Sequence, residues 1–413
     1  MREKQKESLL YLGGCLFLVC YFMQLWNFQM IWMLGISAVF CFCFLIRQKA
    51  LRIDTGLVLL VVTMCSFYVM QYGLRAVATM IPYVPVGMYV LANYLAGEFK
   101  GKENWEKKFI GILLCLVIGY TLHGMMNSYL YYAGYVKPGT RQWFDIWTKT
   151  YMPGTQHNLF YLPVLAMVFP AMMKFREHKI GSSLIVLCSA FFIYTSLVTK
   201  SRISILIFAM IFCGEGLLYL ILEGKKLKKI FGNKKTWMFL GGGALTAGIL
   251  AFLLKDLPVI RAFMENLGRG GGILHNVRFQ LQAKALGQLF DYPFGGRQMD
   301  LFVKYDHQYI HNVWLDMANA SGIIPFFAFS IFAVFGAALL IRFLMRKDFS
   351  VSLKMITAGL YMTFFLFYWV EPALDASIHY MAPWMLIIGM MHGILTEKVI
   401  HLNFLRRGHE REN

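Results

Sequence analysis

The chain has few charged residues and no cysteine outside its apolar stretches. Charged residues make up 15% of the 413 residues, whereas hydrophobic residues make up 58%. This balance excludes an ordinary water-soluble domain, because such a domain needs far more polar and charged surface. All eight cysteines lie in apolar stretches, which excludes an extracellular disulfide framework. The chain also lacks CxxC and HExxH spacings, so we predict no metal site and no cofactor.

Long apolar runs recur along the whole chain. A run of about 20 residues is long enough to cross the apolar core of a bilayer, about 30 Å thick. In a membrane the backbone polar groups must be satisfied within the protein, which favours a bundle of helices. The sequence therefore predicts an all-α membrane protein, a single integral membrane domain over 1–413, with about twelve spans: 9–26, 28–46, 56–72, 76–96, 109–132, 157–173, 180–198, 203–222, 237–254, 312–341, 355–370 and 381–395.

The net charge of +18 is explained by membrane topology. With the N-terminus inside, 27 of the 40 lysines and arginines fall in short segments on the cytoplasmic side, as the positive-inside rule requires. The basic run 225–235 is then a cytoplasmic anchor, so we predict the lipid bilayer as a partner and exclude nucleic acid. The first apolar run lacks a small-residue cleavage site, so we interpret it as a retained helix. Both termini are expected in the cytoplasm.

Two segments on the outer side are long. The segment 133–156 is rich in glycine, proline and aromatic residues, and 255–310 far exceeds the usual length of a connection. Within the second loop, 277–290 has apolar residues Leu281, Ala285 and Leu289 at helical spacing. This spacing predicts an amphipathic helix that lies on the membrane or caps the bundle.

Two arginines are candidates for an anion site. Arg202 stands between two spans with almost no loop, and Ser201 before it adds a hydroxyl donor. A guanidinium can donate two parallel hydrogen bonds to a phosphate. Arg278 stands at the start of the predicted amphipathic helix, where a nearby anion would offset its unfavourable position against the helix dipole. The alternative for both residues is contact with lipid headgroups.

His311 and Asn312 are the candidates for proton chemistry. They begin a span directly after the long loop, and a histidine there can accept a proton from a hydroxyl group near neutral pH. Gly322 follows, where close helix contact is expected. His157 and Asn158 begin another span after the other outer loop, which suggests that the two loops converge on one cavity.

Nearby carboxylates leave other arrangements open. Asp306, His307 and His311 contain a helical histidine pair that could hold a divalent cation, but no third strong ligand accompanies them. On a continuous helix Asp316 is about 140° around the axis from His311. Asp316 is therefore a poor partner for orienting the His311 imidazole. Glu371 and Asp375, in the segment EPALDASIHY, are alternatives that reach the cavity if this loop folds inward.

These segments resemble the O-antigen ligase and O-antigen polymerase family of membrane glycosyltransferases. The resemblance consists of the SR pair at 201–202, the run from Arg278 through the PFGG segment ending at Gly296, and His311-Asn312 followed after nine residues by Gly322. A weaker match is Arg141 together with the QHN segment that ends at Asn158. The matches cover about 141–325 in the order found in the family.

The resemblance implies a type C glycosyltransferase-like bundle in the cytoplasmic membrane, with its active site on the outer face. The donor would be a glycan on undecaprenyl diphosphate, and the acceptor would be a hydroxyl of a glycan or glycolipid. By motif, Arg202 and Arg278 would hold the diphosphate and His311 would activate the acceptor without a metal ion. The same motifs imply further residues that would contact the donor or the acceptor: Arg141, His157, Asn158, Ser201, Asn312 and Gly322. A chain-length regulator protein is an additional expected partner.

Three readings of the activity remain after the motifs are compared. Pro325 stands where ligases of the family tend to have threonine, which leaves surface polysaccharide polymerase and another kind of ligase both open. A flippase or exporter of lipid-linked oligosaccharides is the alternative outside enzymes, although it favours ionisable residues deep inside several spans. Peptidoglycan-polymerising proteins of similar build would need a loop carboxylate such as Asp300 or Asp306 as the base.

Overall fold

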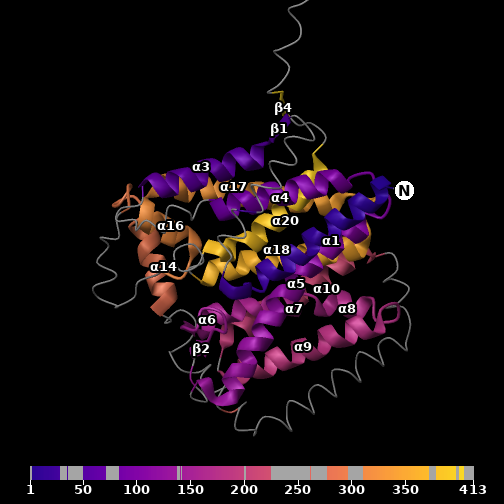
Figure 1. Ribbon diagram of the computed structural model, residues 1–413. Helices are drawn as coiled ribbons and strands as arrows, with labels where there is room; N and C mark the ends of the chain where they lie inside the picture. The colour runs from indigo at the N-terminus through magenta and orange to yellow at the C-terminus, as the bar shows by residue number, and fades with distance from the viewer. Residues whose placement is uncertain are drawn as a thin grey trace, which may run out of the picture. The chain divides into compact units, whose positions relative to one another are not determined.

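The computed structural model describes residues 2–27, 35, 50–70, 83–136, 140, 142–199, 201–224, 261, 277–295, 310–371, 378–396 and 400–403. Most of these residues are helical, and two short antiparallel ribbons complete the described structure (Figure 1). Contacts divide the chain into two compact units. Unit 1 comprises Met1–Gly119, Val277–Phe349 and Phe364–Asn413, and unit 2 comprises Tyr120–Asn276 and Ser350–Thr363. The expectation of one domain over 1–413 stays a prediction.

Unit 1 is built from helices that come from both ends of the sequence. Its helices are α1 (Arg2–Phe22), η1 (Leu25–Asn27), α3 (Thr55–Met70), α4 (Tyr83–Phe99), α14 (Val277–Gly287), α16 (Val313–Ser321), α17 (Ile323–Met345), η6 (Ile378–Met381) and α20 (Ala382–Leu395). Its ribbon pairs β1 (Ala50–Ile53) with β4 (Ile400–Asn403).

Unit 2 contains the middle of the sequence. Its elements are η3 (Tyr131–Tyr135), β2 (Gln142–Phe144), β3 (Tyr151–Pro153), α6 (Gly154–His157), η4 (Asn158–Phe160), α7 (Leu162–Leu165), α8 (Val168–Met173), α9 (Lys179–Val198) and α10 (Arg202–Leu222). Strands β2 and β3 form the second ribbon. Two long helices, α5 (Trp105–Leu130) and α18 (Val351–Val370), contribute residues to both units.

Five helical segments among the described residues are long and apolar enough to cross a membrane. They are Trp105–Tyr135, Lys179–Val198, Arg202–Leu222, Ile323–Met345 and Val351–Val370, and shorter apolar helices occur at Tyr11–Phe22, Thr55–Met70, Asn158–Met173 and Ala382–Leu395. This composition is compatible with an all-α membrane protein. The predicted span 237–254 lies outside the described residues, as does 28–46 apart from Gly35.

Two predicted spans are interrupted. The span 312–341 was expected to be continuous, but it is broken into α16 and α17 at Gly322, which has φ 88° and ψ −169°. The span 157–173 is divided into η4, α7 and α8. Pro163 and Pro170 lie in this stretch, and a proline removes a backbone donor from the helix. The apolar runs in the sequence therefore predicted the extent of these two segments but not the points at which their helices break.

Helices α4 and α20 pack closely in unit 1. Gly389 and Gly393 are four residues apart on α20, and a Cβ at Gly389 would stand 2.8 Å from the Cβ of Ala92. A Cβ at Gly393 would likewise stand 2.8 Å from the Cβ of Ala96. Small residues at this spacing let two helix backbones approach, as in membrane helix pairs of the GxxxG type.

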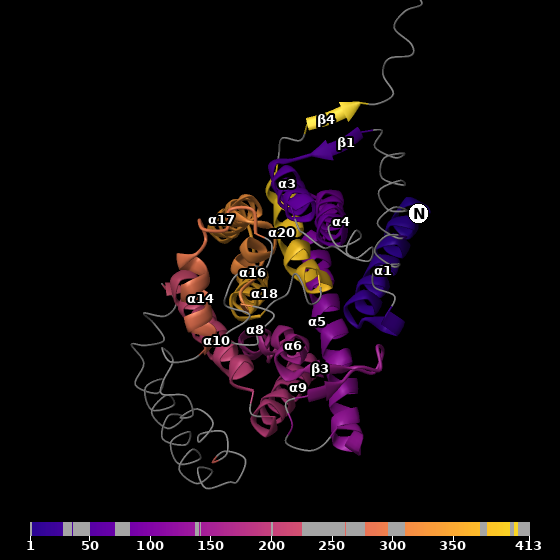
Figure 2. The same cartoon turned by 90° about the vertical axis from the view of Figure 1, so that its left-hand side faces the viewer.

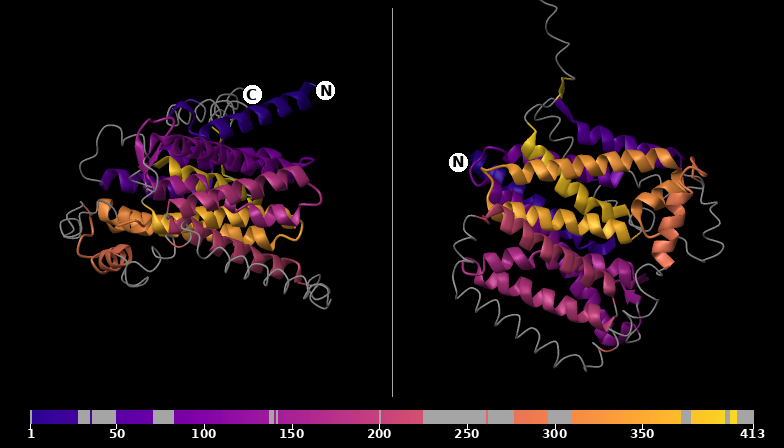
Figure 3. Two further views of the ribbon diagram at one scale, coloured as in Figure 1. Left: turned by 90° about the horizontal axis from the view of Figure 1, so that it is seen from below. Right: turned by 180° about the vertical axis from the view of Figure 1, so that it is seen from behind.

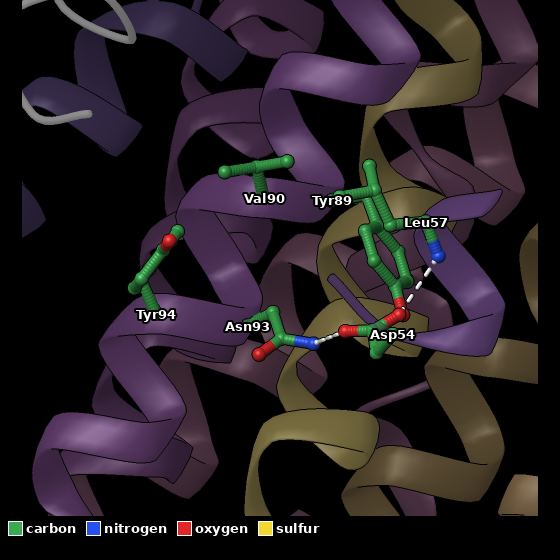
Figure 4. Close-up of a pocket in the computed structure, with 6 residues that line it drawn as sticks. All are labelled: Asp54, Leu57, Tyr89, Val90, Asn93 and Tyr94. Atoms are coloured by element: carbon green, nitrogen blue, oxygen red, sulfur yellow. Dashed lines mark hydrogen bonds between the residues drawn. The ribbon is translucent and has the colours of Figure 1, made fainter. Parts of the chain in front are cut away.

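A buried polar cluster fixes the beginning of α3 to this helix pair. Asp54 accepts hydrogen bonds from the Leu57 backbone N–H at 2.8 Å, the Tyr89 hydroxyl at 2.8 Å and the Asn93 amide at 2.6 Å (Figure 4). His392 Nδ1 lies 3.3 Å from Asp54 Oδ1. Burial raises the pKa of Asp54, but His392, the Leu57 N–H and the Tyr89 hydroxyl together outweigh burial and hold this pKa below its ordinary value.

The two ends of α3 contact different parts of unit 1. Its first turn follows Asp54 and the β1–β4 ribbon, which Figure 2 shows beside the start of α3. Near its other end, the Phe67 carbonyl accepts a hydrogen bond of 2.8 Å from Ser321, just before α17. Helices α3 and α17 run side by side (Figure 3). Because α3 has 16 residues, these two contact regions are about 20 Å apart.

Candidate functional site

Helix α14 presents an arginine at its first turn. The helix covers Val277–Gly287, within the range 277–290 where the sequence predicts one. Leu281, Ala285 and Leu289 are buried, so the apolar residues of the predicted pattern face the protein. Arg278, in the first turn, has a side chain that is 29% exposed.

Arg278 is held by the segment that ends α18. Its Nη1 donates to Glu371 Oε1 at 3.0 Å and to the Val370 carbonyl at 3.2 Å. The Glu371 side chain is only 2% exposed. An ion pair with one buried partner is strongly oriented, because losing the arginine would leave a buried carboxylate without its counter-charge. Glu371 therefore fixes the direction of the guanidinium.

Glu371 also faces His311. The second carboxylate oxygen, Oε2, lies 3.7 Å from His311 Nδ1, and no described residue donates a hydrogen bond to Oε2. His311 has φ 61°, a left-handed conformation that is uncommon for residues other than glycine and marks sites worth attention. One carboxylate thus lies between the two residues that the sequence singled out for anion binding and for proton transfer.

Asp316 holds the backbone on both sides of His311. Its Oδ1 accepts the Ile310 N–H at 2.7 Å, and its Oδ2 accepts the Asn312 N–H at 3.1 Å. The expectation that Asp316 is a poor orienting partner for the His311 imidazole stays a prediction. It assumed that His311 belongs to the helix, whereas α16 begins only at Val313. Asp316 holds the backbone of the residues before and after His311.

Asn312 is the residue that starts α16. Its Oδ1 accepts the Leu315 N–H at 3.1 Å, which is an N-cap interaction. Its amide nitrogen donates to the Trp369 carbonyl at 3.4 Å. Gln282 of α14 donates to the His311 carbonyl at 3.1 Å. The loop that carries His311 is therefore tied to α14, α16 and the end of α18.

The PFGG segment meets the break at Gly322. The Ile323 N–H donates to the Pro293 carbonyl at 2.9 Å. A Cβ at Gly322 would overlap that carbonyl, and a Cβ at Gly295 would stand 2.6 Å from the Gly322 nitrogen. Both glycines also have positive φ, 88° and 69°, which side chains disfavour. Two of the segments that carry the family resemblance are thus in backbone contact.

An apolar groove of about 580 Å³ lies beside these residues. Trp314, Phe326 and Trp369 are among the rings that line it, and Gln282 and Asn312 are among its few polar groups. The groove is formed by α14, α16, α17 and the end of α18. Phe279 and Asn312, the sequence neighbours of Arg278 and His311, line this groove. An apolar groove next to residues of this kind can receive an amphiphilic molecule with an anionic head.

The remaining predicted residues fall in the unit 2 range Tyr120–Asn276. Asn158 donates a hydrogen bond of 2.6 Å to the Ser201 hydroxyl, and Ser201 is the residue before Arg202, the first residue of α10. The structure therefore brings Asn158, Ser201 and the start of α10 together. The convergence of Arg202 with Arg278 and His311 stays a prediction, and Arg141 lies outside the described residues.

His157 is buried against aromatic rings. Its ring stacks on Trp143 with centroids 3.9 Å apart and an angle of 3° between the planes, and neither ring nitrogen has a hydrogen-bond partner among the described residues. His157 is fully buried, so its surroundings are those of a core residue. Its role in contacts with donor or acceptor stays a prediction.

Asp145 anchors the turn between β2 and β3. It accepts hydrogen bonds from His123 Nε2 at 2.7 Å and from the backbone N–H groups of Trp147 and Thr148 at 2.9 and 2.8 Å. Burial raises the pKa of Asp145. The hydrogen bond to His123, the charge of His123 and the two backbone donors outweigh burial and hold this pKa far below its ordinary value. Nothing in the spacing of His123 and Asp145 predicts this pair.

The described part of the chain contains no group of three His, Cys, Asp or Glu side chains placed to hold a metal ion. Asp300, Asp306, His307 and Asp375 lie outside the described residues, so the alternatives built on them stay predictions. Glu371, the other carboxylate of the EPALDASIHY segment, does reach the site. No protein-family model matches the chain, and a search of curated proteins finds no relative.

Proposed function

We propose that the chain is a membrane glycosyltransferase that moves a glycan from undecaprenyl diphosphate to an acceptor hydroxyl. It would act on the outer face of the cytoplasmic membrane as a surface polysaccharide polymerase or an O-antigen-type ligase. The observation that carries the proposal is the placing of Arg278 and His311 on one buried carboxylate, Glu371, beside an apolar groove. The family resemblance of the same segments supports it independently.

The groove and the arginine suit the two ends of such a donor. A polyprenyl chain needs an apolar surface, and the lining of the groove is almost entirely apolar. Its diphosphate needs fixed cations, and a guanidinium has five N–H donors that can be divided between a carboxylate and a phosphate. Arg278 would stabilise the negative charge that develops when the diphosphate leaves. By the resemblance, Arg202 is the second arginine that binds the diphosphate.

His311 would accept the proton of the acceptor hydroxyl. The acceptor oxygen forms a bond to the anomeric carbon, the bond from that carbon to the diphosphate oxygen breaks, and undecaprenyl diphosphate leaves with the bonding electrons. Nδ1 of His311 faces Glu371, so Nε2 is the nitrogen assigned to the hydroxyl. A carboxylate behind an imidazole fixes its orientation and stabilises the imidazolium that forms, as in the serine protease triad.

The proposal includes the membrane arrangement that the sequence predicts. The chain would have about twelve spans, both termini in the cytoplasm and the loops 133–156 and 255–310 outside. The β1–β4 ribbon supports this arrangement, because it pairs two segments that the positive-inside rule assigns to the same side. Ser321, at the end of the helix that follows His311, contacts the other end of α3, about 20 Å from the ribbon.

Substitution of His311 by alanine tests the proposal. The purified variant is expected to lose about 10²–10⁴-fold in the rate of glycan transfer, the usual contribution of a general base. A strain that lacks the gene and carries this variant should make no long glycan, although the variant inserts at the wild-type level. The matched control is His178→Ala, because His178 is an exposed histidine of unit 2. Long glycan in the His311→Ala strain would rule out the mechanism.

Arg202→Lys tests the diphosphate contact. A lysine keeps the positive charge but loses the planar pair of donors, so transfer should fall strongly if Arg202 binds the diphosphate. Near-normal activity would instead indicate that Arg202 only reaches lipid headgroups.

Comparing Asp306→Asn with His311→Ala distinguishes the peptidoglycan-type mechanism, which predicts that the aspartate variant is the inactive one.

Export of lipid-linked oligosaccharides is the second candidate function. It is favoured by Glu215, an ionisable residue that is 4% exposed inside α10, because carboxyl groups within spans mark the ion pathways of transporters. Vesicles that contain the purified protein distinguish the two functions. Movement of the lipid-linked donor across the membrane without a new glycosidic bond would favour export, whereas a longer glycan without such movement would favour transfer.

A further inference from the structure

A carboxyl group lies well inside α10. Glu215 is 4% exposed and stands seven residues before the last residue of the helix, about 10 Å from that end. Its Oε1 has no hydrogen-bond partner among the described residues. An ionised carboxylate in apolar surroundings without a partner is very costly, and such a group takes up a proton instead. The surroundings of Glu215 therefore favour the protonated acid.

A glycine on the neighbouring helix makes the space for this group. Gly359 belongs to the part of α18 that lies in unit 2, as Glu215 does. A Cβ at Gly359 would overlap Glu215 Oε1 and would stand 3.4 Å from the Ala166 carbonyl oxygen. The carboxyl group and this carbonyl therefore border the same small space, which any larger residue at position 359 would fill.

The Ala166 carbonyl lacks its normal helical donor. Ala166 follows α7, and the residue four positions later is Pro170, which has no N–H to donate. No backbone N–H in the described ranges donates to this carbonyl. A buried carbonyl without a donor destabilises the folded protein. A protonated carboxyl group can supply the donor, whereas a carboxylate would only add a second acceptor.

The helices around Glu215 offer few competing groups. Helices α7 and α8 contain no titratable side chain, and they pack with α9 and α10 in unit 2. Away from the ends of α9 and α10, the surrounding helices carry six other titratable side chains: Cys188 and Tyr194 of α9, Cys213 and Tyr219 of α10, and Lys354 and Tyr361 of α18. In the part of the chain that the structure describes, none of the six forms a hydrogen bond with Glu215.

We propose that Glu215 is a proton-binding site inside the membrane-spanning part of unit 2. The carboxylic acid O–H donates to the Ala166 carbonyl, in the space that Gly359 leaves open. The ligand is a proton, and the site is a carboxyl group that reacts as an acid at neutral pH. The proposal does not rest on glycosyl transfer.

Labelling with dicyclohexylcarbodiimide tests the protonation state. This apolar reagent reacts with protonated carboxyl groups in membranes. The acid transfers its proton to a carbodiimide nitrogen, the carboxylate oxygen bonds to the central carbon, and the O-acylisourea rearranges to a stable N-acylurea. In the full-length protein in lipid nanodiscs at pH 7, mass spectrometry should find the adduct on Glu215 and none at that position in Glu215→Gln. A wild-type protein without the adduct would contradict the proposal.

Infrared spectroscopy tests the hydrogen bond to Ala166. The difference spectrum of wild type minus Glu215→Gln should contain the C=O stretch of a protonated, hydrogen-bonded carboxyl group at neutral pH. A carboxylate band in its place would overturn the proposal. Glu215→Gln should fold, because the amide can also donate to the carbonyl.

Pro170→Ala tests the acceptor, because the backbone then regains an N–H that can donate to the Ala166 carbonyl. The carboxyl stretch of Glu215 should move to higher frequency in this variant. An unchanged band would show that Ala166 is not the acceptor.

Discussion

His311 is held by its neighbours in the chain as well as by Glu371. Its positive φ is unfavourable for a side chain with a Cβ, so the conformation depends on contacts that fix the backbone. The carboxylate of Asp316 supplies them by accepting the N–H groups of Ile310 and Asn312. The position of the imidazole is therefore sensitive to a residue that holds the backbone on both sides of it.

We expect Asp316→Asn to weaken this arrangement. An asparagine has one acceptor oxygen in its side chain, so one of the two N–H groups loses its partner, at a cost of about 1–3 kcal/mol. The rate of glycan transfer should fall although His311 is still present. The measurement is the initial rate together with the unfolding midpoint in detergent. A variant with the wild-type rate and stability would show that the Asp316 contacts are not needed.

The buried pair of Asp145 and His123 makes the stability depend on pH. Because the pKa of Asp145 is depressed in the folded protein, its contribution is fully present above its unfolded pKa of about 4 and is lost as the pH falls through the folded pKa. Asp145→Asn should therefore lower the unfolding midpoint at pH 7, and by a smaller amount at pH 3, where only the part of the contribution between pH 4 and pH 3 has been lost. Equal differences at both pH values would contradict the assignment.

The contact between α4 and α20 is set by two glycines at the scale of the element. Replacing Gly389 by valine should force the helices apart, because a Cβ there would already stand 2.8 Å from Ala92. Overpacking of this kind typically costs about 1–3 kcal/mol, measured as a lower unfolding midpoint in detergent. The matched control is Gly214→Ala on α10, where an added Cβ would meet no atom within 4 Å. The same loss in both variants would argue against close packing.

The sequence predicts the elements of the site better than their contacts. The spacing of Leu281 and Ala285 predicts α14, and Asn312 is of the type that begins a helix. The pairing of Arg278 with Glu371 joins residues 93 positions apart, and no local pattern encodes such a distance. The break at Gly322 was missed because apolar residues continue on both sides of it. Local patterns report burial, whereas these features depend on tertiary contacts.

At the scale of the whole molecule, the proposed topology can be tested by labelling from one side of the membrane. Asp291 and Lys347 are exposed, and the topology puts them outside and inside, respectively. In a variant without its native cysteines, Asp291→Cys should react with a membrane-impermeant maleimide in intact cells or spheroplasts. Lys347→Cys should react only after the membrane is opened. The reverse pattern would place the candidate site in the cytoplasm and refute transfer on the outer face.

The division of unit 1 among three chain segments has a consequence for biosynthesis. The N-terminal helices leave the ribosome long before Glu371, α20 and β4, which complete the same unit. Strand β1 must therefore wait until residues 400–403 have been synthesised before its partner strand exists. Nascent chains arrested before residue 371 should be inserted in the membrane yet lack the carboxylate that faces His311, so this centre is assembled only after Glu371 has been synthesised.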